Sequence, residues 1–150
     1  SSPSRRFRRM TCRVLVDTGP LVALRNENDA DHTLCVETLK SISTPMFTCW
    51  PVLTEAAYLL RRNPILVREL LVASYSGLLS VLPLRRNDIA QINRILATYD
   101  DQSFQLADAA LMWLSEREGI EQVFTLDRKD FEVFRNEAGQ AVQIIPAVVA

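Results

Sequence analysis

Two short apolar runs, one near each end of the chain, both finish on an aspartate. Val14-Leu15-Val16 is followed by Asp17 and then by Thr18-Gly19-Pro20, and Val123-Phe124-Thr125-Leu126 is followed by Asp127. Short apolar runs bounded by turn residues are typical of strands buried in a parallel sheet. Because a parallel α/β fold collects its site at the carboxyl ends of its strands, we expect Asp17 and Asp127 to share one edge of the sheet.

Further segments alternate between strand-like and helix-like patterns. Strands are predicted over 13–17, 46–50, 78–82, 122–126 and 142–145. Helices are predicted after Gly19 and over 30–42, 51–62, 64–75, about 88–99, 105–118 and 127–134, with Asn87 or Asp88 as the N-cap of the fifth. This alternation predicts an α/β fold, a three-layer α/β/α domain with a largely parallel central sheet.

Length and composition favour one globular domain over residues 11–150, since the chain has 150 residues, of which 48% are hydrophobic and 23% charged. No apolar run is long enough to span a membrane. Residues 1–10 carry Arg5, Arg6, Arg8 and Arg9 without an apolar stretch, which is unlike a secretory signal. We expect either a disordered basic arm, as a solvated tail or an RNA contact, or an extension upstream of a natural start at Met10.

The charge balance limits how this chain could hold nucleic acid. The formal net charge is −1, and without the four arginines of residues 1–10 the remainder carries −5. A protein that grips nucleic acid by neutralising phosphates is normally basic. If this protein acts on nucleic acid, metal ions and local arginine clusters must supply the grip.

The cysteines and the single histidine exclude several chemistries. Cys12, Cys35 and Cys49 are odd in number and lack metal-ligand spacing, so we expect reduced thiols and a cytoplasmic location. His32 is the only histidine. Serine–histidine–aspartate catalysis and histidine-rich zinc sites are therefore disfavoured.

Two further acids lie inside apolar helical segments. Glu55 precedes Ala56-Ala57, and Asp108 lies within Leu106-Ala107-Asp108-Ala109-Ala110-Leu111. An acid flanked by alanines on a packed helix is costly to bury unless it is paired or bound to metal. Taken singly, these two could lie on exposed helix faces, Asp17 could form a turn, and Asp127 could cap a helix. Taken together, the four carboxylates predict a site for a hard divalent cation, Mg²⁺ or Mn²⁺, because like charges at close range need a counter-ion.

Four short motifs in order carry a resemblance to a known family. They are VLVDTGPLVAL at 14–24, LTEAA at 53–57, LADAAL at 106–111 and FTLDRKDF at 124–131. Together they resemble the PIN-domain ribonucleases, and within them the VapC toxins of VapBC toxin–antitoxin pairs, along about residues 12–146. The arginine-rich arm and the helical insert 64–76 depart from the family pattern.

The resemblance implies a catalytic set and a reaction. The family's three central acids correspond to Asp17, Glu55 and Asp108, and its variable fourth acid to Asp127. Thr18 and Thr125 would supply hydroxyls that orient carboxylates or bound waters. Asp130 is in the neighbourhood of a fifth acid, although a helix-surface role fits it equally. We assign Asp17 and Asp108 as the direct metal ligands.

The resemblance also implies a substrate and partners. The expected activity is cleavage of single-stranded or loop RNA by a Mg²⁺- or Mn²⁺-dependent endoribonuclease, leaving 5′-phosphate and 3′-hydroxyl ends. A cognate antitoxin and a homodimer built through 51–62 and 64–76 are the expected protein partners. Candidates to hold the RNA backbone, each also readable as an ordinary surface charge, are Arg25, Arg61, Arg62, Arg128 and Lys129.

Rival classes fit less well. A haloacid-dehalogenase-type phosphatase needs a second acid two residues after the first, where this chain has Gly19. A receiver domain needs an acidic pair before its phosphorylated aspartate, and none is evident. A PIN fold used only for binding or scaffolding would be expected to lose a central acid. A housekeeping RNA-processing nuclease stays open as an alternative to a toxin.

Overall fold

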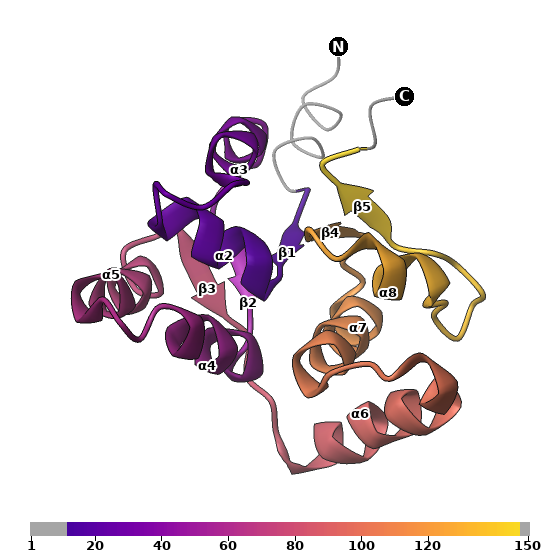
Figure 1. The fold of residues 1–150 in the computed structure, drawn as a ribbon. Coiled ribbons are helices and arrows are strands. Elements are labelled where there is room, and N and C mark those ends of the chain that lie inside the picture. Colours follow the sequence, from indigo (N-terminus) through magenta and orange to yellow (C-terminus); the bar gives the residue numbers. More distant parts are fainter. Residues whose placement is uncertain (1–11, 148–150) are drawn as a thin grey trace.

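The computed structural model describes residues 12–147, in which five short strands alternate with helices (Figure 1). The strands are β1 (Val14–Val16), β2 (Met46–Thr48), β3 (Leu79–Val81), β4 (Gln122–Phe124) and β5 (Gln143–Ile145). The helices are α2 (Thr18–Arg25), α3 (His32–Leu39), α4 (Trp50–Leu59), α5 (Pro64–Ala73), α6 (Arg86–Thr98), α7 (Leu106–Glu118) and α8 (Arg128–Val133), with a 3₁₀ turn η1 (Asp100–Gln102). The predicted arm at residues 1–10 lies outside the described residues.

The sheet is parallel throughout, in the order β3-β2-β1-β4-β5. Strand–helix–strand connections are right-handed almost without exception, so α2–α5 belong on one face and α6–α8 on the other. Figure 1 shows these two groups apart, with α2–α5 in the left half of the view and α6–α8 in the right half. The predicted α/β fold with helices flanking a parallel sheet is confirmed.

The strand order reverses direction beside β1, and this defines where a site forms. The chain runs outward from β1 through β2 to β3, then returns to β4 on the other side of β1. Loops leaving β1 and β4 therefore diverge to opposite faces and leave a crevice at the carboxyl edge of the sheet. Asp17 and Asp127 follow these two strands.

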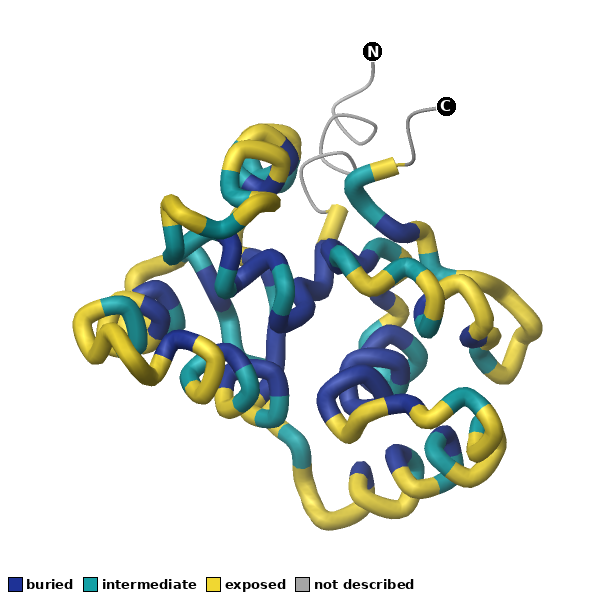
Figure 2. Tube along the Cα trace, in the orientation of Figure 1, coloured by how far each residue is buried: buried dark blue, intermediate teal, exposed yellow. Residues whose placement is uncertain are grey.

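The core is formed by the sheet and by α7, the most deeply buried helix (Figure 2). Most residues from Ala107 to Ser115 are buried, and the small side chains of Ala107, Ala109 and Ala110 let α7 pack closely against α6 and α4. None of the helices in residues 12–147 is long and apolar enough to span a bilayer.

The start of α6 differs from the prediction. The N-cap is Arg85, and Asp88 is the third residue inside the helix, where its carboxylate accepts the Arg85 N–H at 2.6 Å. The predicted cap at Asn87 or Asp88 was wrong because the acid acts from within the first turn instead of preceding it. The polar stretch between α6 and α7 contains η1.

Candidate active site

Asp17 is fixed at the end of β1 with its carboxylate buried. Its N–H donates to the carbonyl of Phe124 at 2.9 Å, which extends the β1–β4 pairing to the site. The side chain is 5% exposed, and the Thr125 hydroxyl donates to its Oδ2 at 2.8 Å. The same hydroxyl oxygen accepts the Asp127 N–H at 3.0 Å, so Thr125 holds both strand-end acids.

Asp108 enters the site from the first turn of α7. Its side chain is 7% exposed, and its Oδ2 accepts the N–H of Gln105 at 3.1 Å. This bond orients the carboxylate across the amino terminus of the helix. The alanines on either side leave no bulk between Asp108 and the crevice.

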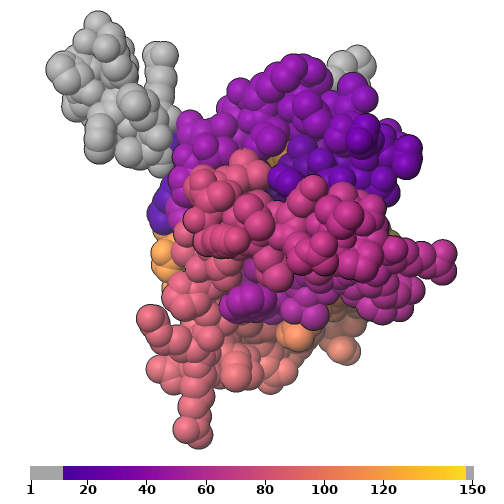
Figure 3. All heavy atoms as spheres, turned by 90° about the vertical axis from the view of Figure 1, so that its left-hand side faces the viewer, coloured from indigo at the N-terminus to yellow at the C-terminus, as the bar shows by residue number. Residues whose placement is uncertain are grey.

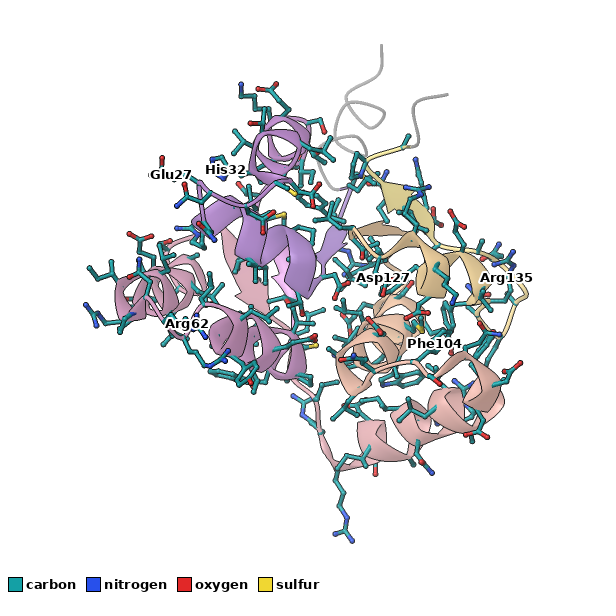
Figure 4. The ribbon with its side chains drawn as sticks, in the orientation of Figure 1. Glu27, His32, Arg62, Phe104, Asp127 and Arg135 are labelled. Atoms are coloured by element: carbon teal, nitrogen blue, oxygen red, sulfur yellow. The ribbon has the colours of Figure 1, made fainter. Side chains whose placement is uncertain are left out.

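Three carboxylates meet beside α7. Oxygens of Asp108, Asp127 and Asp130 all lie within 4.8 Å of one another, although Asp127 is exposed and Asp130 half-buried. Figure 4 shows Asp127 between the two groups of helices, close to α7. The sequence alone left Asp130 undecided, and the signal for it was its position three residues after Asp127, which places both acids on one side of a short helix.

Glu55 approaches from α4 on the other side of Asp17. The Thr18 hydroxyl donates to its Oε2 at 3.2 Å, and the Glu55 side chain is half-buried. Both predicted hydroxyls, Thr18 and Thr125, thus hydrogen-bond carboxylates of the predicted site. Their catalytic roles stay predictions.

The electrostatics show that these acids strain one another. Burial, partly offset by hydrogen bonds from the Thr18 N–H and the Thr125 hydroxyl and reinforced by the charges of Glu55 and Asp127, raises the pKa of Asp17 to about 6. Burial and the charge of Asp17 raise the pKa of Asp108 to about 7, against the lowering effect of the Gln105 N–H. The pKa of Asp130 is also raised, by burial and then by the charge of Asp127.

No side-chain cation of the described chain relieves this strain by direct contact. Within residues 12–147, none of the site's acids forms an ion pair. The donors are hard carboxylate oxygens held at a spacing that a small ion can bridge, and they fit a divalent cation of the Mg²⁺ or Mn²⁺ type.

The basic candidates are spread over the surface. Arg25 pairs with Glu69 at 3.9 Å, and Arg128 contacts Glu132 at 3.3 Å and donates to the carbonyl of Pro146 at 2.8 Å. Lys129 is exposed beside the three-acid cluster. The two arginines that follow α4 differ: Arg62 lies at the outer edge of the molecule, well away from Asp127 (Figure 4), whereas Arg61 lies over the ring of Tyr58 at 3.9 Å.

This fold and acidic site define a class. The chain matches the PIN domain over residues 14–136, and it therefore belongs to the PIN-domain family. PIN domains typically bind a divalent metal ion, in keeping with the acidic cluster described above.

Two relatives narrow the resemblance. The chain is 28% identical over 135 residues to Ribonuclease VapC26 of Mycobacterium tuberculosis (strain ATCC 25618 / H37Rv), covering 89% of this chain and 100% of that protein. Its fold matches the crystal structure of Mycobacterium tuberculosis VapC20, described as a Sarcin-Ricin loop cleaving toxin, with a TM-score of 0.68 and 23% identity over 77% of this chain and 91% of the other. The chain is thus a distant homologue of the VapC toxin ribonucleases, and the predicted resemblance is confirmed.

Proposed function

We propose that this protein is a metal-dependent endoribonuclease of the toxin type. The observation that carries the proposal is a group of carboxylates without an ion-pair partner among the described residues, with Asp17 and Asp108 buried, at the carboxyl edge of a PIN-domain sheet. Replacing or pairing these acids would reduce the repulsion between them and stabilise the fold. Unpaired acids at the crevice therefore favour a functional role for their charge.

Within this proposal each acid has a task. Asp17 and Asp108 would hold the ion directly, and Asp127 and Asp130, whose carboxylate oxygens lie within 4.8 Å of that of Asp108, would support it. When bound, Mg²⁺ or Mn²⁺ lowers the pKa of a water and stabilises charge on the phosphate. Glu55 and Asp127 orient attacking water or support a second ion, and one of them accepts its proton. Thr18 and Thr125 fix the carboxylates of Glu55 and Asp17 by hydrogen bonds.

The relatives suggest the substrate class. VapC26 is a ribonuclease by name, and VapC20 cleaves the Sarcin-Ricin loop. We infer hydrolysis of single-stranded or looped RNA to 5′-phosphate and 3′-hydroxyl ends. Arg25, Arg61, Arg62, Arg128 and Lys129 remain the candidates to contact its backbone.

The surface of α4 and α5 supports a homodimer. Exposed apolar side chains on these helices, within the predicted interface 51–62 and 64–76, include Leu59, Ile65, Leu71 and Val72. Figure 3 looks onto this side and shows the magenta atoms of α5 spread across the middle of the face. Apolar residues gathered in this way commonly mark an interface.

An antitoxin partner is the second proposed protein contact. The acidic pocket has a negative potential that an arginine or lysine of a partner can neutralise much as a metal does. Such a partner would lie beside α4 and place a basic side chain near Glu55 or Asp127.

Cleavage of single-stranded RNA by the purified protein tests the proposal. Activity should require Mg²⁺ or Mn²⁺, disappear on chelation and return with Mn²⁺. Full activity in excess chelator would contradict the metal requirement.

Growth arrest on expression, relieved by the neighbouring gene, would support the toxin role, whereas RNA cleavage without growth arrest or a bound neighbour would indicate a housekeeping nuclease. Metal binding without any RNA cleavage would indicate a binding or scaffolding module.

A further inference from the structure

An exposed stripe on α4 contains two aromatic side chains beside the acidic site. Trp50, Thr54 and Tyr58 are spaced four residues apart, so they lie along one side of the helix. Trp50 and Tyr58 are each 60% exposed. Eight residues of helix separate them by about 12 Å along the axis, so each ring offers a separate flat surface.

The stripe forms one wall of a groove. The groove has a volume of about 630 Å³, and its other wall is the start of α7, with Gln105, Leu106 and Ala107. Glu55 lines it as well, and Ala107 precedes Asp108 in the chain. The groove therefore shares Glu55 with the proposed site and is bordered by the residue before Asp108, so an occupant of the groove lies beside the proposed reaction site.

A positive charge is fixed beside Tyr58. The guanidinium of Arg61 lies 3.9 Å from the centre of the Tyr58 ring, and its Nη1 donates to the carbonyl of Tyr58 at 2.8 Å. A cation stacked on a ring in this way is available to a phosphate without losing its contact with the protein. The groove thus has apolar walls, polar groups on Thr54 and Gln105, and a cation near Tyr58.

We propose that this groove binds an unpaired nucleobase of the RNA strand next to the scissile phosphate, with Trp50 as its stacking surface. The inference depends on the proposed nuclease function and names how that site holds its substrate. A phosphodiester in the acidic pocket carries a base on each side, and the groove is the apolar space that adjoins the pocket. The base stacks on Trp50, Thr54 and Gln105 contact its edge, and Arg61 neutralises a neighbouring phosphate.

This arrangement explains how an acidic domain selects single strands. A base can stack on protein only when it is unpaired, so a duplex is excluded without any sequence readout. Stacking is tolerant of base identity because every base has a flat face. The favourable contact with the base also offsets the shortage of positive charge around the pocket.

The test compares a labelled single-stranded oligoribonucleotide with the same strand lacking its bases. Binding is measured by fluorescence anisotropy to protein carrying Asp108→Asn, which leaves the groove intact and prevents cleavage. The intact strand should bind more tightly than the abasic one. Trp50→Ala should reduce this preference by about 5- to 140-fold, the fold-change equivalent of one stacked base, and leave binding of the abasic strand unchanged.

Matched variants separate stacking from general damage. Trp50→Phe keeps an aromatic face and should keep most of the preference. Ile89→Ala removes an apolar side chain of similar exposure, 66%, from α6 and should change nothing. In cleavage assays with the catalytic Asp108 present, Trp50→Ala should raise KM more than it lowers kcat, and thermal melting should show that the fold is intact.

The outcomes distinguish the groove from the nuclease activity. A base preference that Trp50→Ala abolishes supports the groove even if wild-type protein cuts no RNA, in which case the proposed nuclease function fails alone. Equal preference in wild type and in Trp50→Ala overturns the groove while leaving cleavage standing. If neither the intact strand nor the abasic strand binds, the proposal is also overturned. Unchanged RNA binding, with loss of binding to the protein encoded next to this one, would assign the groove to that partner.

Discussion

Two buried aspartates of this molecule have the same local setting and opposite electrostatics. Asp108 in α7 and Asp88 in α6 are each the third residue of a helix, each 7% exposed, and each accepts the N–H of the residue before its helix. The difference between them comes from what the rest of the fold places opposite each carboxylate.

Asp88 is neutralised by its own chain. The Nε1 of Trp113 donates to Oδ1 at 2.8 Å, and the Nη1 of Arg117 donates to Oδ2 at 3.0 Å. Burial acts to raise the pKa of Asp88, but hydrogen bonds from the Arg85 N–H, Trp113 and Arg117 outweigh it, so the pKa is lowered. This aspartate fastens α6 to α7.

Asp108 faces carboxylates instead. Carboxylate oxygens of Asp127 and Asp130 lie within 4.8 Å of one of its own, and burial together with the charges of Asp17, Asp130 and Asp127 raises its pKa to about 7. Burial of an acid therefore does not by itself mark a functional site. Asp108 has no cationic side chain beside it among the described residues, so it is the functional candidate. Asp88 is paired with Arg117, so its role is structural.

The largest expected effect is on catalysis. Asp108→Asn keeps the side-chain shape and removes one charge, so RNA cleavage should fall by about three orders of magnitude or more, since the metal supplies several kcal/mol of transition-state stabilisation. The metal-free fold should hold or gain stability because repulsion decreases. Initial rates and chemical denaturation measure the two effects. An unfolded variant, or one that cuts RNA at nearly the wild-type rate, would defeat the assignment.

Asp88→Asn should show the reverse pattern. The substitution removes one of the two carboxylates that pair with Arg117 and leaves Glu118 at 2.9 Å, and the free energy of unfolding should decrease by about 1–3 kcal/mol because Trp113 and Arg117 lose a charged acceptor. Cleavage per folded molecule should be unchanged. Asp100→Asn, on an exposed carboxylate, is the control and should change stability by no more than about 0.5 kcal/mol. A stable but inactive Asp88→Asn protein would break the distinction between the two acids.

A smaller effect is expected from the buried hydroxyl that orients the pocket. Thr125→Val removes the bonds to Asp17 and to the Asp127 N–H and should weaken metal binding about 10- to 100-fold. Thr38→Val is the control, because Thr38 is also a buried threonine but its hydroxyl donates to the carbonyl of Leu34 at 2.8 Å, within α3. Metal titrations of the two variants should differ, and equal affinities would show that Thr125 is only a packing residue.

The fourth effect is a pH dependence of the stability of the metal-free protein. Asp17 and Asp108, with pKa values raised to about 6 and about 7, take up protons in the folded state before they would in the unfolded chain. Without metal, the free energy of unfolding should therefore increase as the pH falls from about 8 to about 5, by at most about 1.4 kcal/mol per pH unit for each proton. Stability contributed by Asp88, whose pKa is lowered, should be lost only as the pH falls below about 4.

Denaturant titrations at several pH values measure this dependence. Asp108→Asn should reduce the pH dependence of the free energy of unfolding between about pH 8 and pH 5, because it removes one carboxyl that binds a proton in the folded state. Saturating Mn²⁺ should reduce it in the wild type, because the ion competes with protons for the carboxylates. If the free energy of unfolding of the metal-free wild type decreases as the pH falls from about 8 to about 5, the pKa values of these acids are not raised in the folded state.

The sequence predicted the parallel sheet because that depends on local patterns, and of its four predicted acids the structure brings oxygens of Asp108 and Asp127 within 4.8 Å of each other. Apolar runs ending at Asp17 and Asp127 marked strand ends, and parallel strands bring their carboxyl ends to one edge. The sequence assigned Asp108 to the site and Asp88 only to a helix cap, and it could not show that Asp88 is neutralised, because the partners of Asp88 are distant in the chain. Trp113 and Arg117 lie 25 and 29 residues after Asp88, and only the packing of α7 on α6 brings them together.

Asp130 and the groove beside α4 were beyond local patterns for the same reason. The spacing of Asp130 from Asp127 places both acids on one side of α8, but whether that side faces Asp108 depends on the direction in which α8 leaves β4. Trp50 looked like part of a strand when the chain alone was considered, and the structure instead makes it the first residue of α4 and leaves it exposed.

Calorimetric titration with Mn²⁺ tests the central claim most directly, since it counts both the ions bound and the protons released. At pH 7 the pKa of Asp108, raised to about 7, leaves that carboxyl partly protonated, so metal binding should release about half a proton or more per molecule, detected as a dependence of the heat on buffer ionisation. Asp108→Asn should abolish both the binding and the proton release, while Asp88→Asn measured below its melting temperature should retain them. Absence of Mn²⁺ binding to the wild type, or binding that survives Asp108→Asn unchanged, would contradict the account.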